Sequence, residues 1–233
     1  MNGARRRLAL EQVAQAGHHS VAHNHHLYLR PRRLWVMPQG RHNRLNEQGP
    51  AIRWALFIYR GMHNVKYDFS SCHVDVPNPL AEEIIKWGKE NVGDDDIYVT
   101  SHDPTFGRED EIHITILYGI HTDDPEEIRP ILENAGPVTI RLGKVDVFTN
   151  PFKFDVVMIE VISEDLSRLH WQIRERLPST YKYDRYNPHV TISYVKKGKG
   201  WRHRGIDLWE GREFVCNYSI FSAKNGVKKV FPL

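Results

Sequence analysis

The sequence has little cysteine and no long apolar run. Its 233 residues include two cysteines, Cys72 and Cys216. Two cysteines make no disulfide framework, so we expect a reducing, cytoplasmic setting. No apolar run approaches the ~20 residues of a membrane-spanning helix, and the longest candidate, Trp54–Tyr59, has the length of a buried strand. No apolar segment follows the N-terminal arginines, so no secretory signal is expected. A disulfide-rich secreted protein and a membrane protein are thus disfavoured.

Lysine is absent from the first 60 residues. This part contains ten arginines and two acidic residues, a formal net charge of +8. Residues 61–233 carry 22 basic and 27 acidic residues, a net charge of −5. Long duplex nucleic acid is therefore a poor candidate substrate, because its binding depends on many phosphate contacts with basic side chains. A short or cyclic nucleotide fits better.

The change to mixed lysine and arginine usage falls close to Met62. We therefore expect a basic, His- and Arg-rich N-terminal extension over 1–61, disordered or solvated, and a complete functional domain over 62–233. Five histidines of the extension cluster within residues 18–26. A histidine-rich tract can bind metal. This spacing matches no defined site and includes no cysteine, so we expect no metal there.

One six-residue pattern occurs twice, as HITILY over His113–Tyr118 and as HVTISY over His189–Tyr194. Aligned from the histidine, the copies agree at His, Thr, Ile and Tyr. Both are dense in Ile, Val and Thr, which is typical of buried strands. Because side chains alternate along a strand, each copy presents an imidazole and a hydroxyl on one face and an apolar anchor on the other. If the strands lie side by side, two imidazoles and two hydroxyls converge.

This set of groups suits the cleavage of a phosphodiester. One histidine can deprotonate the attacking hydroxyl and the other can protonate the leaving oxygen, since an unperturbed imidazole titrates near pH 6.5. Threonine hydroxyls can donate hydrogen bonds to the phosphate oxygens on which charge develops. We therefore predict His113 and His189 as acid and base, in either order, and Thr115 and Thr191 as phosphate-binding residues. The mechanism needs no metal and no cofactor.

The paired motifs resemble those of the 2H phosphoesterase superfamily, which is named for two H-x-T motifs on a duplicated fold. Its members include RNA 2′,3′-cyclic phosphodiesterases, "2′-5′ RNA ligase" proteins and phage nucleases that destroy cyclic-oligonucleotide signals. The resemblance covers roughly residues 64–233. It implies a metal-independent phosphodiesterase acting on a small RNA-derived phosphodiester, either a 2′,3′-cyclic phosphate or a 2′-5′ linkage. The expected partner is a small nucleotide or short RNA, with no membrane, and the protein is expected to be a monomer.

The hydrophobic pattern predicts an α+β fold with an internal duplication. Two β-α-β lobes are expected, roughly over 64–150 and 151–233, each with one H-x-T strand near its end. The family resemblance adds two antiparallel sheets that face a central groove. Expected helices and strands alternate along the chain: strands over 65–76, 138–148, 154–161, 214–223 and 227–231, and helices over 81–91, 123–133 and 163–177.

Two polar segments lead into the motif strands, residues 101–111 and 179–188. Loops that enter a catalytic strand are natural places for substrate contacts. In the first segment we predict that Phe106 stacks on a base and that Arg108 pairs with a phosphate. In the second we predict a phosphate contact for Arg185 and base stacking by Tyr186. His170, on the expected third helix, is predicted to be packed or exposed and not catalytic.

Other functions compete with this interpretation. A nuclease that degrades cyclic-oligonucleotide defence signals would use the same site. A metal-dependent hydrolase is less favoured, because both motifs have threonine where a ligand set would have a carboxylate. A protein that binds nucleotide or RNA without turnover would keep the same groove, and fold alone does not separate binding from catalysis.

Overall fold

The computed structural model describes residues 67–101, 106–150, 153–181 and 183–233. The chain divides into two units, Met1–Phe57 and Ile58–Leu233, and every described residue belongs to the second. The expected extension over 1–61 and its histidine cluster therefore lie outside the described residues, and its boundary stays a prediction. No helix in the described part is long and apolar enough to cross a membrane.

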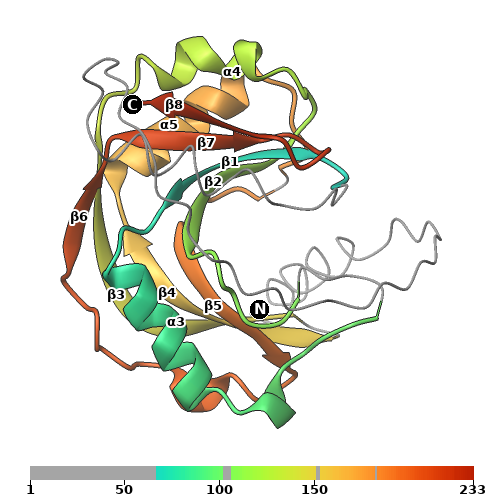
Figure 1. Ribbon diagram of the computed structural model, residues 1–233, viewed down its shortest axis with the longest axis vertical. Helices are drawn as coiled ribbons and strands as arrows, with labels where there is room; N and C mark the ends of the chain where they lie inside the picture. The colour runs from blue at the N-terminus through green and yellow to red at the C-terminus, as the bar shows by residue number, and fades with distance from the viewer. Residues whose placement is uncertain (1–66, 102–105, 151–152, 182) are drawn as a thin grey trace, which may run out of the picture. The chain divides into compact units, whose positions relative to one another are not determined.

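All described strands belong to one antiparallel sheet of eight strands, in the order β6-β3-β4-β5-β2-β1-β7-β8 (Figure 1). The predicted α+β class and antiparallel pairing are confirmed. The family resemblance implied two sheets, but the structure joins them into one, because β2 and β5 are hydrogen-bonded at the pair Ile114–Val190. The strands are β1 Ser70–Asp75, β2 His113–Ile120, β3 Val138–Thr149, β4 Phe154–Ile162, β5 His189–Lys196, β6 Glu213–Cys216, β7 Tyr218–Ser222 and β8 Lys228–Pro232.

The two halves of the sheet do not coincide with the lobes expected from the sequence. Strand β3 joins β4, and strand β7 joins β1, so each half takes strands from both ends of the domain. The expected strand over 214–223 is interrupted at Asn217. The part before Asn217 is β6, which pairs with β3, and the part after it is β7, which pairs with β1. Because β6 and β7 are separated by one residue and pair in opposite halves, the two ends of the sheet come close together and the sheet must curl, as Figure 1 shows. The Cys216 thiol contacts the Asp75 carbonyl across this closure at 3.4 Å.

Three helices pack on the outer face of the curled sheet (Figure 1). They are α3 Leu80–Asn91, α4 Pro125–Leu132 and α5 Glu164–Arg176, accompanied by the 3-10 turns η2 Asp94–Asp96 and η3 Trp201–His203. Each buries one apolar face, as its 3.6-residue period predicts, although Ile85 and Trp87 of α3 are only half-buried. Helix α5 begins at a serine cap, whose Ser163 hydroxyl accepts a hydrogen bond from the Leu166 amide at 3.1 Å.

Helix α3 lies very close to strand β5. Gly88 is buried, and a Cβ atom at this position would lie 2.9 Å from Cγ2 of Ile192. The helix can therefore pack this tightly only because residue 88 has no side chain. Ile192 follows Thr191 directly, so this contact supports one of the two motif strands from behind.

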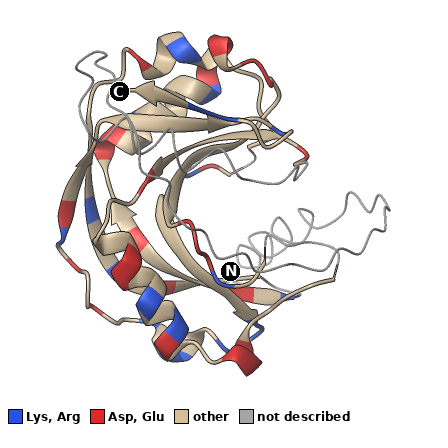
Figure 2. Cartoon of the chain, viewed as in Figure 1, with Lys and Arg blue, Asp and Glu red and all other residues tan. Residues whose placement is uncertain are grey.

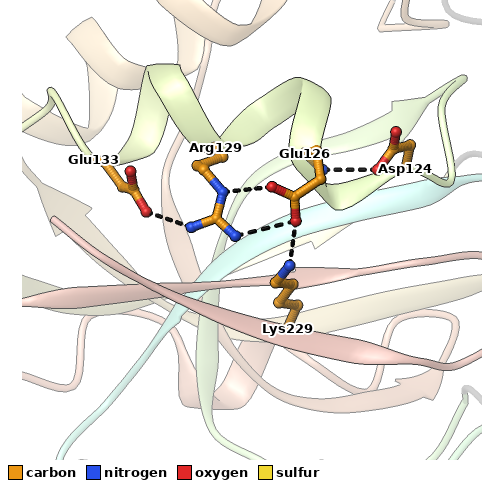
Figure 3. Close-up of polar contacts among 5 residues, drawn as sticks. All are labelled: Asp124, Glu126, Arg129, Glu133 and Lys229. Carbon is orange, nitrogen blue, oxygen red and sulfur yellow. Dashed lines mark hydrogen bonds and ion pairs between the residues drawn. The ribbon is translucent and has the colours of Figure 1, made fainter.

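Helix α4 is tied to the edge strand β8 by charged side chains (Figure 3). Arg129 donates to Glu126 at 2.6 Å and to Glu133 at 2.7 Å, and Lys229 of β8 also contacts Glu126. The Asp124 carboxylate caps the helix by accepting from the Glu126 amide at 2.9 Å. Helices α3 and α4 carry many of the charged residues on the outside of the domain (Figure 2).

Candidate active site

The two motif strands lie side by side at the centre of the sheet. Ile114 and Val190 pair there and are fully buried, so their neighbours point to the opposite, inner face of the curl. The inner face is the one that carries His113, Thr115, His189 and Thr191, all of them half-buried. Antiparallel register about this pair sets His113 beside Thr191 and Thr115 beside His189. The histidines thus lie on a diagonal, for which a separation of roughly 7–8 Å is typical.

A β-bulge follows the threonine in each motif strand. The register skips one residue between Thr115 and Leu117, and it skips one again between Thr191 and Ser193. With strict alternation, a residue five places after the histidine would face the core. The bulge inserts one extra buried residue, so the tyrosine of each motif returns to the inner face. Tyr118 is 48% exposed, and its counterpart in β5 is half-buried. The tyrosines that match between the two motifs were visible in the sequence, but only the bulge shows that both face the inner side of the sheet.

The duplication extends to the strands that flank the motif strands. Asp75 of β1 pairs with His113, and Glu160 of β4 pairs with His189. Each acidic residue follows a phenylalanine by six positions, Phe69 in one half and Phe154 in the other. Each catalytic candidate therefore has a carboxylate as its cross-strand neighbour. Sequence reasoning missed this second repeat, although its spacing was visible.

Both histidines are held through the same ring nitrogen. Nδ1 of His113 lies 2.8 Å from the carbonyl of Glu111, and Nδ1 of His189 lies 2.9 Å from the carbonyl of Asn187. A carbonyl oxygen only accepts, so each Nδ1 carries the proton and donates it. In the neutral ring Nε2 is then unprotonated and available as a base, and in the charged ring Nε2–H is available as an acid.

The surroundings of the two histidines differ. The edge of Phe148 meets the His189 ring at a centroid distance of 4.8 Å, and buried Met158 lies beside its strand partner Thr191. Burial lowers the pKa of His189 below its usual value, the Asn187 carbonyl opposes this shift, and positive charge on His113 adds to it. The neutral form of His189 is therefore favoured.

A third histidine, His73, lies on the inner face beside His113. Its ring centroid is 5.0 Å from that of His113, and Nε2 is 3.8 Å from the Asp75 carboxylate. Burial holds the pKa of His73 well below its usual value, and positive charge on His113 and Lys228 acts in the same direction. A neutral imidazole therefore packs against His113. The equivalent position in the other half of the sheet is Met158, because His73 pairs with Thr115 as Met158 pairs with Thr191. The alternation of polar residues along β1 was the signal that could have found it.

The two predicted substrate contacts of the first loop are Phe106 and Arg108, and their surroundings in the structure differ. Phe106 packs among the rings of Tyr98, Phe154 and Tyr194, at centroid distances of 5.0–5.2 Å. It stays half-exposed, and base stacking by it stays a prediction.

Arg108 binds the end of α3 and the turn that follows it. Its guanidinium donates to the Asp94 carboxylate at 2.6 Å, and the carbonyls of Gly88 and Val92 are further acceptors. These hydrogen bonds give Arg108 a structural role, and its phosphate contact stays a prediction.

The second loop anchors strand β2 at its bulge. The Tyr186 hydroxyl donates to the Thr115 carbonyl at 2.8 Å, and its ring stacks on His170 at 4.2 Å. His170 is fully buried, as packed residues are, and its Nδ1 donates to the Ile116 carbonyl at 2.7 Å. Tyr186 thus has a structural role at the bulge, and base stacking by it stays a prediction. Arg185 is exposed next to it, and its phosphate contact stays a prediction.

In the described part of the chain, no group of three or more His, Cys, Asp or Glu residues is placed to hold a metal ion. The two central strands, each with an H-x-T motif and a histidine of fixed tautomer, have the arrangement of a 2H phosphoesterase. A profile of the 2′-5′ RNA ligase superfamily matches residues 77–201, more than half of the chain. The chain belongs to this superfamily of 2H phosphoesterases.

Solved structures with a similar fold have low sequence identity. Kluyveromyces marxianus Usb1 with uridine monophosphate is 11% identical with a TM-score of 0.47, over 71% of this chain and 98% of that one. E. coli LigT complexed with 3′-AMP is 15% identical with a TM-score of 0.45, over 71% and 94%. TT0787 of Thermus thermophilus is 18% identical with a TM-score of 0.44, over 70% and 94%. A search of curated protein sequences found no match.

Proposed function

We propose that this protein is a metal-independent phosphodiesterase that cleaves a small RNA-derived phosphodiester, a 2′,3′-cyclic phosphate or a 2′-5′ linkage. The observation that carries the proposal is the diagonal pair of histidines, each with Nδ1 fixed by a carbonyl and each beside the other motif's threonine. Membership of the 2′-5′ RNA ligase superfamily supports the same class of substrate.

In the proposed mechanism, His189 is the base and His113 is the acid. The assignment is supported by the apolar contact of His189 with Phe148, since burial favours the neutral form. Nε2 of His189 takes the proton of the attacking water as its oxygen bonds to phosphorus. The bond from phosphorus to the leaving ribose oxygen breaks, and Nε2–H of protonated His113 gives that oxygen its proton. Two acid–base groups on a diagonal suit such an in-line exchange, in which entering and leaving oxygens lie on opposite sides of phosphorus.

Thr115 and Thr191 stabilise the charge that develops on the non-bridging oxygens. Their hydroxyls can donate to these oxygens from between the histidines. The candidates for contacts with the rest of the nucleotide are Phe106, Arg108, Arg185 and Tyr186. The expected substrate is short, because residues 61–233 carry a net negative charge, which does not favour a long polyanion.

The test is an activity panel on the full chain in excess EDTA. It includes 2′,3′-cyclic mononucleotides, 2′-5′-linked oligoadenylate, and cyclic di- and trinucleotides. We expect turnover of one of the first two classes, and His113→Ala and His189→Ala should each lower kcat/KM by roughly 10²–10⁴. His121→Ala, at an exposed histidine near the end of β2, is the matched control and should retain activity.

The other outcomes distinguish the alternatives. Turnover restricted to cyclic di- or trinucleotides would identify a nuclease of cyclic signals with the same site. Activity abolished by EDTA would contradict the two-histidine mechanism. Tight nucleotide binding without turnover of any substrate would make the protein a binding module and overturn the proposal.

A further inference from the structure

A cavity of about 640 Å³ lies beside His189 on the inner face. Its described lining comes from strands β3 and β4, the first turn of α5 and residues 186–188. This volume is within the range of roughly 300–1,000 Å³ that is typical of small-molecule sites. None of the assigned catalytic groups lines the cavity, so it is distinct from the phosphate position.

Three contacts connect the cavity to the catalytic histidine. Phe148 lines the cavity and meets the His189 ring edge-on. Asn187 lines it and holds Nδ1 of His189 through its carbonyl. Glu160 lines it and is the cross-strand partner of His189. A group bound in the cavity therefore lies next to a phosphate held at His189.

The walls are apolar and acidic. Phe148, Met158 and Pro188 supply apolar surface, and no lysine or arginine occurs in the described lining. A second phosphate is therefore a poor occupant, because it would lack a cation and meet carboxylates. A flat aromatic ring whose edge carries N–H groups suits both the apolar walls and the acidic ones.

Two carboxylates of the lining, Glu164 and Glu160, have no partner among the described residues, and the one that lies opposite His189 is Glu160. It is exposed, and the described residues offer it neither an ion pair nor a side-chain hydrogen bond. Asp146, also in the lining, is already paired with Arg204 at 2.8 Å. A side chain at Gly143 would collide with Glu160, since a Cβ there would lie 2.9 Å from its Cβ and 3.2 Å from Oε2. The bulge glycine of β3 thus leaves room for the carboxylate.

We propose that this cavity binds the nucleobase of the substrate and prefers guanine, with Glu160 as the acceptor. The inference rests on the proposed phosphodiesterase function. An ionised carboxylate only accepts hydrogen bonds, and guanine presents two adjacent donors, N1–H and the 2-amino group. Adenine and cytosine present one amino group. Uracil presents a single N–H between two carbonyl oxygens, which would face the carboxylate unfavourably.

The experiment compares kcat/KM for guanosine and uridine 2′,3′-cyclic monophosphates, and for 2′-5′ dinucleotides that carry the same bases. For the full wild-type chain we expect a guanine-to-uracil ratio of roughly tenfold or more, the scale of one bidentate contact to a base. In Glu160→Gln the ratio should fall to near one. The ratio cancels any effect of the substitution on His189, because both substrates use the same acid and base.

The duplication supplies the matched control. Asp75 occupies the position of Glu160 in the other half, opposite His113, and does not line the cavity. Asp75→Asn should therefore change the rate for both substrates alike and keep the guanine-to-uracil ratio. Thermal melting of both variants checks that they fold, which the surface position of Glu160 favours.

Each remaining outcome counts against one claim. No turnover of any substrate by the wild-type chain overturns the proposed function itself. Turnover without a guanine preference overturns the inference and leaves the proposed function standing. The inference is also overturned if Glu160→Gln keeps the ratio, or if Asp75→Asn loses it as well.

Discussion

At the scale of single residues, His113 and His189 have the same hydrogen bond and different neighbours. A carbonyl two residues upstream fixes each ring, whereas Phe148 contacts one ring and His73 contacts the other. A duplicated site can therefore place its two imidazoles in different surroundings. In this way two copies of one motif can serve as base and as acid.

The pH dependence of kcat/KM should report this asymmetry. A base acts only when neutral, so activity rises as pH increases through the pKa of His189. Because burial lowers that pKa, we expect the acid limb of the profile below the usual histidine value of about 6.5. Phe148→Ser admits water to the ring, raises the pKa of His189 and should move the acid limb to higher pH.

Phe148→Leu is the control for this measurement, because it keeps an apolar side chain beside His189. Its acid limb should stay near that of the wild type, whatever the change in rate. An acid limb that does not move in Phe148→Ser would show that this limb does not belong to His189, and the assignment of base and acid would then be reversed.

The threonine hydroxyls make a second prediction at this scale. Thr115→Val and Thr191→Val keep the side-chain shape and remove the donor. Each should lower kcat by roughly 10²-fold, the lower end of the range for removing one positioned donor. Thr115→Ser and Thr191→Ser retain the hydroxyl and should keep most of the activity. Equal rates for the valine and serine variants would contradict phosphate binding by these hydroxyls.

At the scale of secondary-structure elements, the site depends on how the outer helices hold the motif strands. Tyr186 and His170 fix the backbone of β2 around its bulge, and α3 supports β5 behind Ile192. The bulges matter because they decide which side chains reach the inner face. Residues outside the candidate catalytic set therefore hold the backbone that positions this set.

Gly88→Ala tests the support behind β5. Overpacking against Ile192 costs about 1–3 kcal/mol, and the better helix propensity of alanine returns up to about 1 kcal/mol. We expect a net loss of about 1–2 kcal/mol in the free energy of unfolding, measured by urea denaturation. Glu90→Ala, on the exposed side of the same helix, should stay within about 0.5 kcal/mol of the wild type. A variant as stable as the wild type would show that α3 can move away without cost.

The elements also show how far sequence reasoning reaches. The motif strands and the three helices follow from local periodicity, and the burial of Ile114, Val190 and Ile84 agrees with it. The β-bulges and the division between β6 and β7 depend on partners distant in sequence, so no local pattern predicts them. The same limit applies to the structural contacts of Arg108, whose acceptors lie at the end of α3, and of Tyr186, whose partners lie on β2 and α5.

At the scale of the whole molecule, the composition predicts that residues 62–233 are sufficient. We expect this fragment, expressed alone, to be soluble, to unfold cooperatively, and to match the full chain in kcat/KM on the substrate that the activity panel identifies. The reason is that the paired motifs and all described strands lie within it. An insoluble or inactive fragment would show that residues 1–61 contribute to folding or to substrate recognition.

The exchange of strands between the halves has a consequence for how the chain folds. Strand β1 pairs with β7, where Ser71 lies opposite Ser222. The hydrogen bonds of β1 therefore cannot all form until residue 222 has been synthesised. Neither half of the sheet is complete until nearly the whole domain has left the ribosome. Such a high contact order predicts slow folding compared with a helical domain of this size. It also predicts that the two halves form together, so the active-site seam between β2 and β5 assembles in the same cooperative step as the rest of the sheet.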